Sequence, residues 1–109
     1  MARRKRMEPI PIEVDRLIVA ICGDYDRRTR ILRRSTAEEA MRAAFATLNH
    51  TIDDAIATVC EPGICRQIRL DIGARRGARR TPLYCLGEAT YKRRKHEAKL
   101  AIARALHLL

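Results

Sequence analysis

The sequence predicts an all-α fold in which a helical hairpin packs on a C-terminal helix-turn-helix. Apolar residues make up 47% of the 109-residue chain and are mostly Ala, Ile and Leu, with one Phe, three Tyr and no Trp. This mixture favours helices over sheets. Apolar residues also recur at three- and four-residue steps, which is the period of an amphipathic helix. Five Gly and four Pro are too few for the many turns of an all-β fold.

The chain is expected to form one domain, because about 100 residues support a single hydrophobic core. Residues 1–9 are basic and without apolar periodicity, which predicts a disordered tail. Residues 10–109 then form a single helical domain. Within it we expect a helical hairpin over residues 12–61 and a helix-turn-helix-like DNA-binding part over residues 63–109.

A first helix is predicted from about residue 12 to about residue 33, with Pro11 suited to its first turn. Its apolar residues form one stripe at helical spacing, consisting of Val14, Leu17, Ile18, Ile21, Tyr25 and Leu32. Charged residues are expected on its other faces, namely Asp15, Arg16, Asp24, Arg27 and Arg28. Such an amphipathic helix needs a packing partner.

A second helix is predicted to begin at Ser35 and Thr36, because each hydroxyl precedes a glutamate by three residues in a capping-box pattern. It should run to about Cys60, before the helix-stopping residues 61–63. Its apolar positions approach a heptad seam and are Met41, Phe45, Leu48, Ile52, Ala55, Ile56 and Val59. The short link predicts an antiparallel hairpin of the first two helices.

Two further helices are expected in the C-terminal half. Ile64, Ile68 and Ile72 mark a short helix that ends near Gly73, and residues 74–81 read as an exposed basic loop. The last helix starts at about residues 87–90 and continues to about Leu106. Its buried side is predicted to contain Tyr91, Ala98, Ile102, Ala105 and Leu106. Tyr91 is therefore expected to be a core aromatic residue and not a base-stacking platform.

Charge indicates the class of partner. The chain has 23 Lys and Arg against 13 Asp and Glu, which gives a formal net charge of +10. The two signs are segregated: residues 35–63 contain five acids and only Arg42 as a base, whereas residues 75–99 contain nine bases and two acids. Segregated positive charge is typical of proteins that bind a polyanion. Nucleic acid is the partner that this pattern favours over a membrane surface, an acidic protein or simple solvation.

The last helix is basic in its first turns and apolar in its later turns. Since the helix dipole favours anions at the N-terminus, this arrangement is stabilised by an external anion such as phosphate. A helix anchored by its C-terminal half and projecting its basic N-terminal half resembles a recognition helix in the major groove. Predicted base-reading residues are Glu88, Ala89, Lys92 and Arg93. Predicted DNA-backbone contacts are Arg75, Arg76, Arg79, Arg80, Thr90, Arg94, Lys95 and Lys99.

Residues 83–98, LYCLGEATYKRRKHEA, together with the helix that ends in ALHLL, resemble the C-terminus of phage late-gene transcription regulators of the ArpU and RinA type. The resemblance implies a helix-turn-helix of the kind found in sigma-factor region 4. It also implies a sequence-specific double-stranded DNA-binding transcription regulator encoded by a phage or prophage. Gly87 stands where Ser is usual as the cap, and Pro82 with the basic loop replaces part of a longer amphipathic helix.

Neither an enzyme nor a metal site is expected. The four cysteines lack a zinc-ligand spacing, because Cys60 and Cys65 are separated by four residues and no second Cys or His pair completes the set. We expect them to be small buried apolar residues without disulfides. The three histidines are isolated from any nucleophile motif, and no glycine-rich phosphate loop occurs. The sequence therefore predicts no catalytic residue, no metal and no cofactor.

The chain is expected to be cytoplasmic and independent of membranes. Its basic start is followed by Glu8 and two prolines where a signal peptide would be apolar. The longest apolar run, residues 17–22, is far shorter than the roughly 20 residues that span a bilayer.

Two alternative functions stay open at this point. The first is an RNA-binding or ribosome-associated protein, which small size and high charge also suit, although the chain lacks aromatic stacking platforms and glycine-rich clamps. The second is a helical protein-interaction module whose acidic hairpin docks RNA polymerase or a capsid component. In that case the acidic residues Glu38, Glu39, Asp53 and Asp54 matter more than the basic helix. The sequence predicts no particular oligomeric state, operator or sign of regulation.

Overall fold

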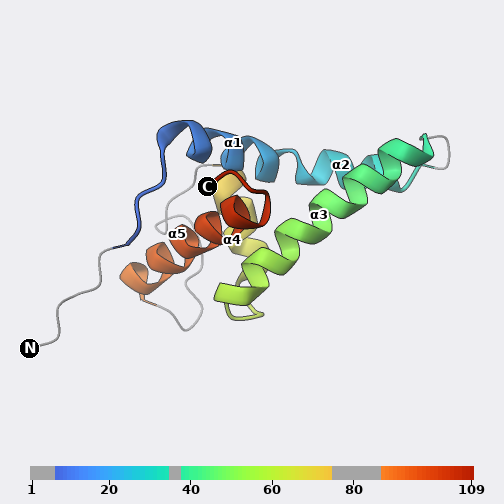
Figure 1. Ribbon diagram of the computed structural model, residues 1–109. Helices are drawn as coiled ribbons and strands as arrows, with labels where there is room; N and C mark the ends of the chain where they lie inside the picture. Colours follow the sequence, from blue (N-terminus) through green and yellow to red (C-terminus); the bar gives the residue numbers. More distant parts are fainter. Residues whose placement is uncertain (1–6, 35–37, 75–86) are drawn as a thin grey trace, which may run out of the picture.

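The computed structural model describes residues 7–34, 38–74 and 87–109, and these residues form helices without a strand (Figure 1). The helices are α1 (Ile12–Gly23), α2 (Tyr25–Leu32), α3 (Glu39–Val59), α4 (Cys65–Ala74) and α5 (Glu88–Ala105). The predicted all-α fold is confirmed. Predictions that concern residues 1–6, 35–37 and 75–86 lie outside the described residues.

The predicted first helix is interrupted at Asp24, which separates α1 from α2. The Asp24 carboxylate accepts hydrogen bonds from Arg27 Nε at 2.5 Å and from Arg28 Nη1 at 3.2 Å. Gly and Asp are poor helix formers, so the Gly23-Asp24 pair weakens the helix where the interruption occurs. The two parts have different partners, because α1 packs on α4 and α5 whereas α2 packs on α3.

The predicted antiparallel hairpin is therefore formed by α2 and the first half of α3. Arg42 Nη1 donates to the Arg34 carbonyl at 2.6 Å, and Arg28 Nε donates to Asn49 Oδ1 at 2.7 Å, so the two helices run in opposite directions. We call residues 25–34 and 38–50 the arm, because Figure 1 shows this pair of helices extending away from the other helices. The body consists of α1, α4, α5 and the second half of α3.

The core of the body consists largely of isoleucine. Fully buried isoleucines come from four helices and are Ile18, Ile52, Ile56, Ile68, Ile72 and Ile102. Three predictions of buried positions were wrong: Leu17 and Met41 are 49% and 43% exposed, and Ala105 is exposed as well. Leu17 is on the exposed side of α1, and Met41 lies in the first turn of α3, at the end of the arm away from the body.

Helix α3 begins later than predicted. Its N-cap is Glu38, with φ −59° and ψ 138°, and the helix starts at Glu39. The predicted caps Ser35 and Thr36 lie outside the described residues. The extended backbone of Glu38 sets the first helical turn, and the Glu39 carboxylate within that turn is favoured by the helix dipole.

Two glycines allow α1 and α4 to approach each other closely. A Cβ atom placed on Gly73 would lie 2.7 Å from the Gly23 nitrogen and 2.8 Å from the Gly23 Cα. Backbone therefore contacts backbone at this crossing, and α4 is held against α1. This contact fixes the position of α4, which is one of the helices that α5 contacts.

Candidate nucleic-acid interface

Helix α5 has the two-part design that its sequence indicates. Its later turns are buried through Ala98, Leu100, Ile102 and Ala103, chiefly against α3. Its first turns extend beyond the body in Figure 1. Gly87 is the N-cap and makes no side-chain hydrogen bond to the first turn.

The four predicted base-reading residues, Glu88, Ala89, Lys92 and Arg93, are all exposed. Lys92 Nζ lies 3.3 Å from Glu88 Oε1, and both side chains are about half exposed or more. No ion pair of Arg93 is found within the described part of the chain. The outer face of these first turns thus presents one guanidinium without a partner and one ammonium in a weak surface pair.

The predicted backbone-contacting residues of α5 lie differently. Lys99 is 20% exposed and pairs with Asp15 of α1, with 2.8 Å between Nζ and Oδ1. Arg94 is 28% exposed and pairs with Glu61 at 3.2 Å and with Glu97 at 3.5 Å. The hydrogen bond that Arg94 donates to Glu61 raises the pKa of Arg94 further above its usual value. Both bases therefore attach α5 to the body.

Lys95 and Thr90 are half-buried. Burial lowers the pKa of Lys95, with a further decrease from the neighbouring Lys99, while Asp71 and Asp15 act in the opposite direction. The remaining predicted backbone contacts, Arg75, Arg76, Arg79 and Arg80, lie outside the described residues.

The inward position of these bases had a signal in the sequence. Residues 91, 95, 98, 99 and 102 are spaced as neighbours on one face of a helix. Since Tyr91, Ala98 and Ile102 were expected to be buried, Lys95 and Lys99 belonged to the same face. Counting the basic run as one exposed unit overlooked this spacing.

A buried hydrogen bond connects α4 to the first turns of α5. Tyr91 is fully buried, as predicted, and its hydroxyl donates to Asp71 Oδ2 at 2.5 Å. Gln67 Nε2 donates to the other oxygen of the same carboxylate at 3.0 Å. A buried carboxylate requires such donors. Since Tyr91 has to face Asp71 to donate, this hydrogen bond sets the rotation of α5 about its own axis. Sequence reasoning missed Asp71.

Two buried arginines join the arm to the body. Arg28, predicted on an outer face, is 2% exposed and donates to Asn49, to Asp24 and to the Ile21 carbonyl. Burial lowers its pKa, and the nearby Asp24 carboxylate partly offsets this effect. The Arg69 guanidinium lies 3.7 Å from the centre of the Tyr25 ring, which is a cation–π contact. The sequence did not predict the burial of Arg28 or Arg69, because arginine is usually exposed.

The N-terminal segment contacts α5. His96 Nε2 lies 2.6 Å from the Glu8 carbonyl oxygen, and the Glu8 carboxylate pairs with Arg104. Residues 7–9, although part of the predicted tail, therefore lie against α5.

The cysteines of the described segments are free thiols. Burial raises the pKa of Cys22 to about 11 and that of Cys60 to about 12. Cys65 is half-buried, and Cys85 lies outside the described residues. In residues 7–34, 38–74 and 87–109 no cluster of three or more His, Cys, Asp or Glu is arranged to hold a metal ion. None of the described helices is long and apolar enough to cross a membrane.

Comparison of the chain with protein-family models, with curated proteins and with solved structures found no match. The resemblance to phage late-gene regulators consequently rests on residues 83–98 and the C-terminal helix alone.

Proposed function

We propose that this protein is a sequence-specific double-stranded DNA-binding transcription regulator encoded by a phage or prophage. It acts in the cytoplasm, without a catalytic centre or cofactor. The observation that carries the proposal is the exposure of Glu88, Ala89, Lys92 and Arg93 on the first turns of α5, while the later turns are buried. A recognition helix needs this combination, because its N-terminal residues enter the groove and the rest holds it in place.

The contact between α4 and α5 also supports the proposal. In a helix-turn-helix the helix before the recognition helix fixes its direction, and here the Tyr91–Asp71 hydrogen bond links the two. The connection over residues 75–87 is longer than the three or four residues of the usual turn. Its four arginines are proposed to contact phosphates beside the groove.

The ion pairs refine the roles proposed within α5. Lys99 and Arg94 have to leave Asp15 and Glu61 before they bind phosphate. Lys92 and Arg93 have no such requirement beyond the exposed Glu88 pair. We therefore assign the first contact with DNA to Lys92 and Arg93, with Thr90 adding a hydroxyl group at the groove edge.

The test is a titration of the full chain with duplex DNA, duplex RNA and single-stranded DNA at several salt concentrations. We expect the tightest binding to duplex DNA, and we expect Arg93→Gln to lower the preference for a specific site over random duplex DNA by about 1 to 3 kcal/mol, corresponding to one lost base-edge contact. Arg104→Gln is the matched control, because it removes one charge from the opposite end of the same helix. Preference for duplex RNA, or equal effects of the two substitutions, contradicts the proposal.

A second candidate is the protein-interaction module in which RNA polymerase binds the acidic side of α3. The exposure of Glu38, Glu39, Asp53 and Asp54 favours it. Arg93→Gln leaves such an interaction unchanged, whereas a double substitution of Asp53 and Asp54 by Asn weakens it. Co-sedimentation with RNA polymerase distinguishes the two functions.

A further inference from the structure

Helix α2 presents a basic face away from α3. Its inner face contains Tyr25, Arg28 and Leu32, which share helical spacing and are at least half-buried. The opposite face presents Arg30 and, just past the helix end, Arg33 and Arg34, all of which are exposed.

The acids of α2 are already paired with other bases. Asp24 accepts hydrogen bonds from Arg27 and Arg28, and Asp26 lies 3.5 Å from Arg69 Nη1. No carboxylate within ion-pair distance of Arg30, Arg33 or Arg34 is found in the segments that the structure describes. Their positive charge is therefore open to an external anion.

Two glutamates lie at the same end of the arm. Glu38 and Glu39 start α3, and Arg42 of α3 donates to the Arg34 carbonyl. The arm end still has two more bases than acids. The glutamates interact favourably with the N-terminus of α3, as expected from the helix dipole.

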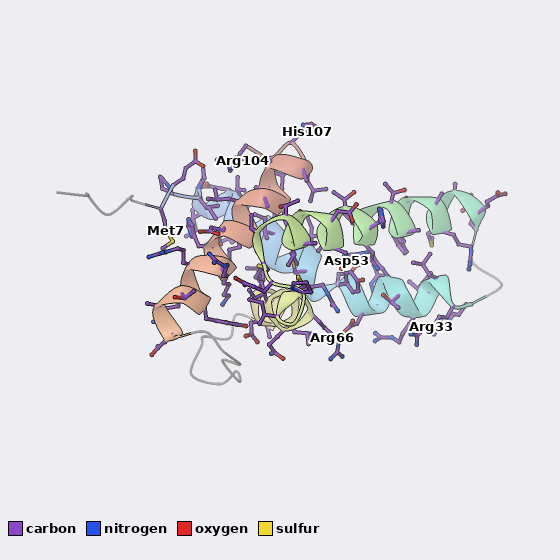
Figure 2. The ribbon with its side chains drawn as sticks, turned by 90° about the horizontal axis from the view of Figure 1, so that it is seen from below. Met7, Arg33, Asp53, Arg66, Arg104 and His107 are labelled. Atoms are coloured by element: carbon purple, nitrogen blue, oxygen red, sulfur yellow. The ribbon has the colours of Figure 1, made fainter. Side chains whose placement is uncertain are left out.

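The basic face of α2 lies on one side of the molecule together with α4 and the start of α5. Figure 2 shows Arg33 of the arm and Arg66 of α4 along one edge, opposite the edge that carries Arg104 and His107. The first turns of α5 lie toward the same edge as Arg33 and Arg66. Arg66 is exposed. A rod-shaped polyanion along this edge meets all three elements.

Helix α3 sets the distance between the two basic surfaces. Arg42 donates to the Arg34 carbonyl at the arm end, and Glu61, two residues after α3, accepts a hydrogen bond from Arg94 in the second turn of α5. The helical residues between them give about 25 Å at 1.5 Å per residue. That length corresponds to about seven or eight base pairs of B-DNA at about 3.4 Å each.

We infer that Arg30, Arg33 and Arg34, with Arg66 between them and α5, form a second phosphate-binding surface. It contacts the backbone of the same DNA duplex about seven or eight base pairs from the α5 site. The inference rests on the proposed function. These arginines are placed on an exposed helix face without a groove-entering helix behind them, so they strengthen binding without reading sequence.

The experiment compares the wild type with the triple variant Arg30→Gln/Arg33→Gln/Arg34→Gln on two DNA duplexes. One duplex is the stem of a DNA hairpin with about 6 base pairs, which is shorter than the separation of the two surfaces and therefore holds only one of them, and the other has about 24 base pairs and holds both. On the longer duplex we expect the salt slope of the triple variant to fall by about 2 to 3, at about 0.9 per lost contact, with an affinity loss of at least about tenfold. On the shorter duplex, bound through α5, we expect less than about a threefold loss.

Two controls keep the outcomes separate. Arg104→Gln removes one charge from the opposite edge, and we expect no change of its slope on either duplex. Far-UV circular dichroism and the melting temperature of the triple variant should match the wild type, because its three side chains are exposed and unpaired among the described residues.

An unchanged slope on the longer duplex overturns the inference, as does an equal loss on both duplexes or an equal loss per charge in Arg104→Gln. If the wild type binds neither duplex, the proposed function fails and the inference fails with it. If Arg93→Gln weakens binding but the triple variant does not, the proposed function stands and only the second surface is rejected.

Discussion

In the arm, α2 and α3 meet through guanidinium, amide and hydroxyl groups, whereas in the body isoleucines from four helices pack against one another. Burial of apolar area is tolerant of small shifts, because the hydrophobic effect has no direction. Hydrogen bonds of buried charged groups require fixed geometry. The comparison teaches that the body supplies most of the stability, while the arm depends on a few polar contacts and opens more easily.

The largest expected effect is in the body, at the crossing of α1 and α4. Gly73→Ala places a Cβ atom within 3 Å of the Gly23 backbone, and backbone cannot move aside as a flexible side chain does. We expect a loss of about 3 kcal/mol in the free energy of unfolding, measured by urea denaturation. Gly63→Ala is the control, since nothing lies within 4 Å of its added Cβ. Equal stability of both variants would show that the helices do not cross as described.

The next effect concerns the polar contacts at the base of the arm. Arg28→Ala removes one buried and two partly buried hydrogen bonds and leaves Asn49 Oδ1 without its donor, so we expect a loss of about 2 kcal/mol. The loss should be concentrated in the arm, where amide hydrogen exchange of α2 accelerates more than that of α5. Arg27→Ala, an exposed neighbour that also binds Asp24, should have a much smaller effect. Uniform acceleration in both helices would contradict a separate arm.

The same substitution at two tyrosines compares the regions directly. Tyr91→Phe removes a donor from the buried Asp71 carboxylate, and we expect a loss of about 1 to 2 kcal/mol. Tyr25→Phe removes a donor from the exposed Asp53, which water replaces, so we expect less than about 0.5 kcal/mol. Thermal melts measure both. If the proposed function holds, Tyr91→Phe also lowers preference for a specific site, because α5 loses its fixed rotation, and Tyr25→Phe does not.

The smallest effect is acid sensitivity of the arm. The hydrogen bond from Arg27 is the main cause of the lowered pKa of Asp24, which falls below its ordinary 3.8. A lowered pKa in the folded state gives stability that is present above the unfolded value and is lost as the pH falls through the folded value. We expect a small acceleration of α2 amide exchange, relative to α5, between about pH 4 and about pH 2. Arg27→Gln should remove most of the difference.

Helix positions could be predicted from the sequence more easily than the function of individual charges. Isoleucines at helical spacing were sufficient to predict the position of α4. The apolar residues in the second half of α5 were sufficient to predict that this half is buried. The break at Asp24 was missed, although the two poor helix formers Gly23 and Asp24 mark the point where α1 and α2 take different partners. Arg28 and Asp71 were missed as well, since burial of a charged side chain depends on donors and acceptors from distant segments.

In the candidate site, too, the exposure of residues could be predicted from the sequence, whereas contacts between distant residues could not. The outward position of Glu88, Ala89, Lys92 and Arg93 agrees with the helical period counted from Tyr91. The pairing of Lys99 with Asp15 joins residues 84 positions apart, and no local pattern predicts such a contact. Function itself stays a proposal, supported by charge and exposure.

The hydrogen bonds of two tyrosines also give the molecule an optical property. With no Trp and three Tyr, near-ultraviolet absorbance comes mainly from phenol rings, and a phenol that donates to a carboxylate absorbs at slightly longer wavelength than a hydrated one. Tyr25 donates to Asp53 where the arm begins, and Tyr91 donates to Asp71 inside the body. Each region therefore has its own hydrogen-bonded tyrosine. In Tyr91→Phe a blue shift of the absorbance on unfolding reports the arm through Tyr25, and in Tyr25→Phe it reports the body through Tyr91.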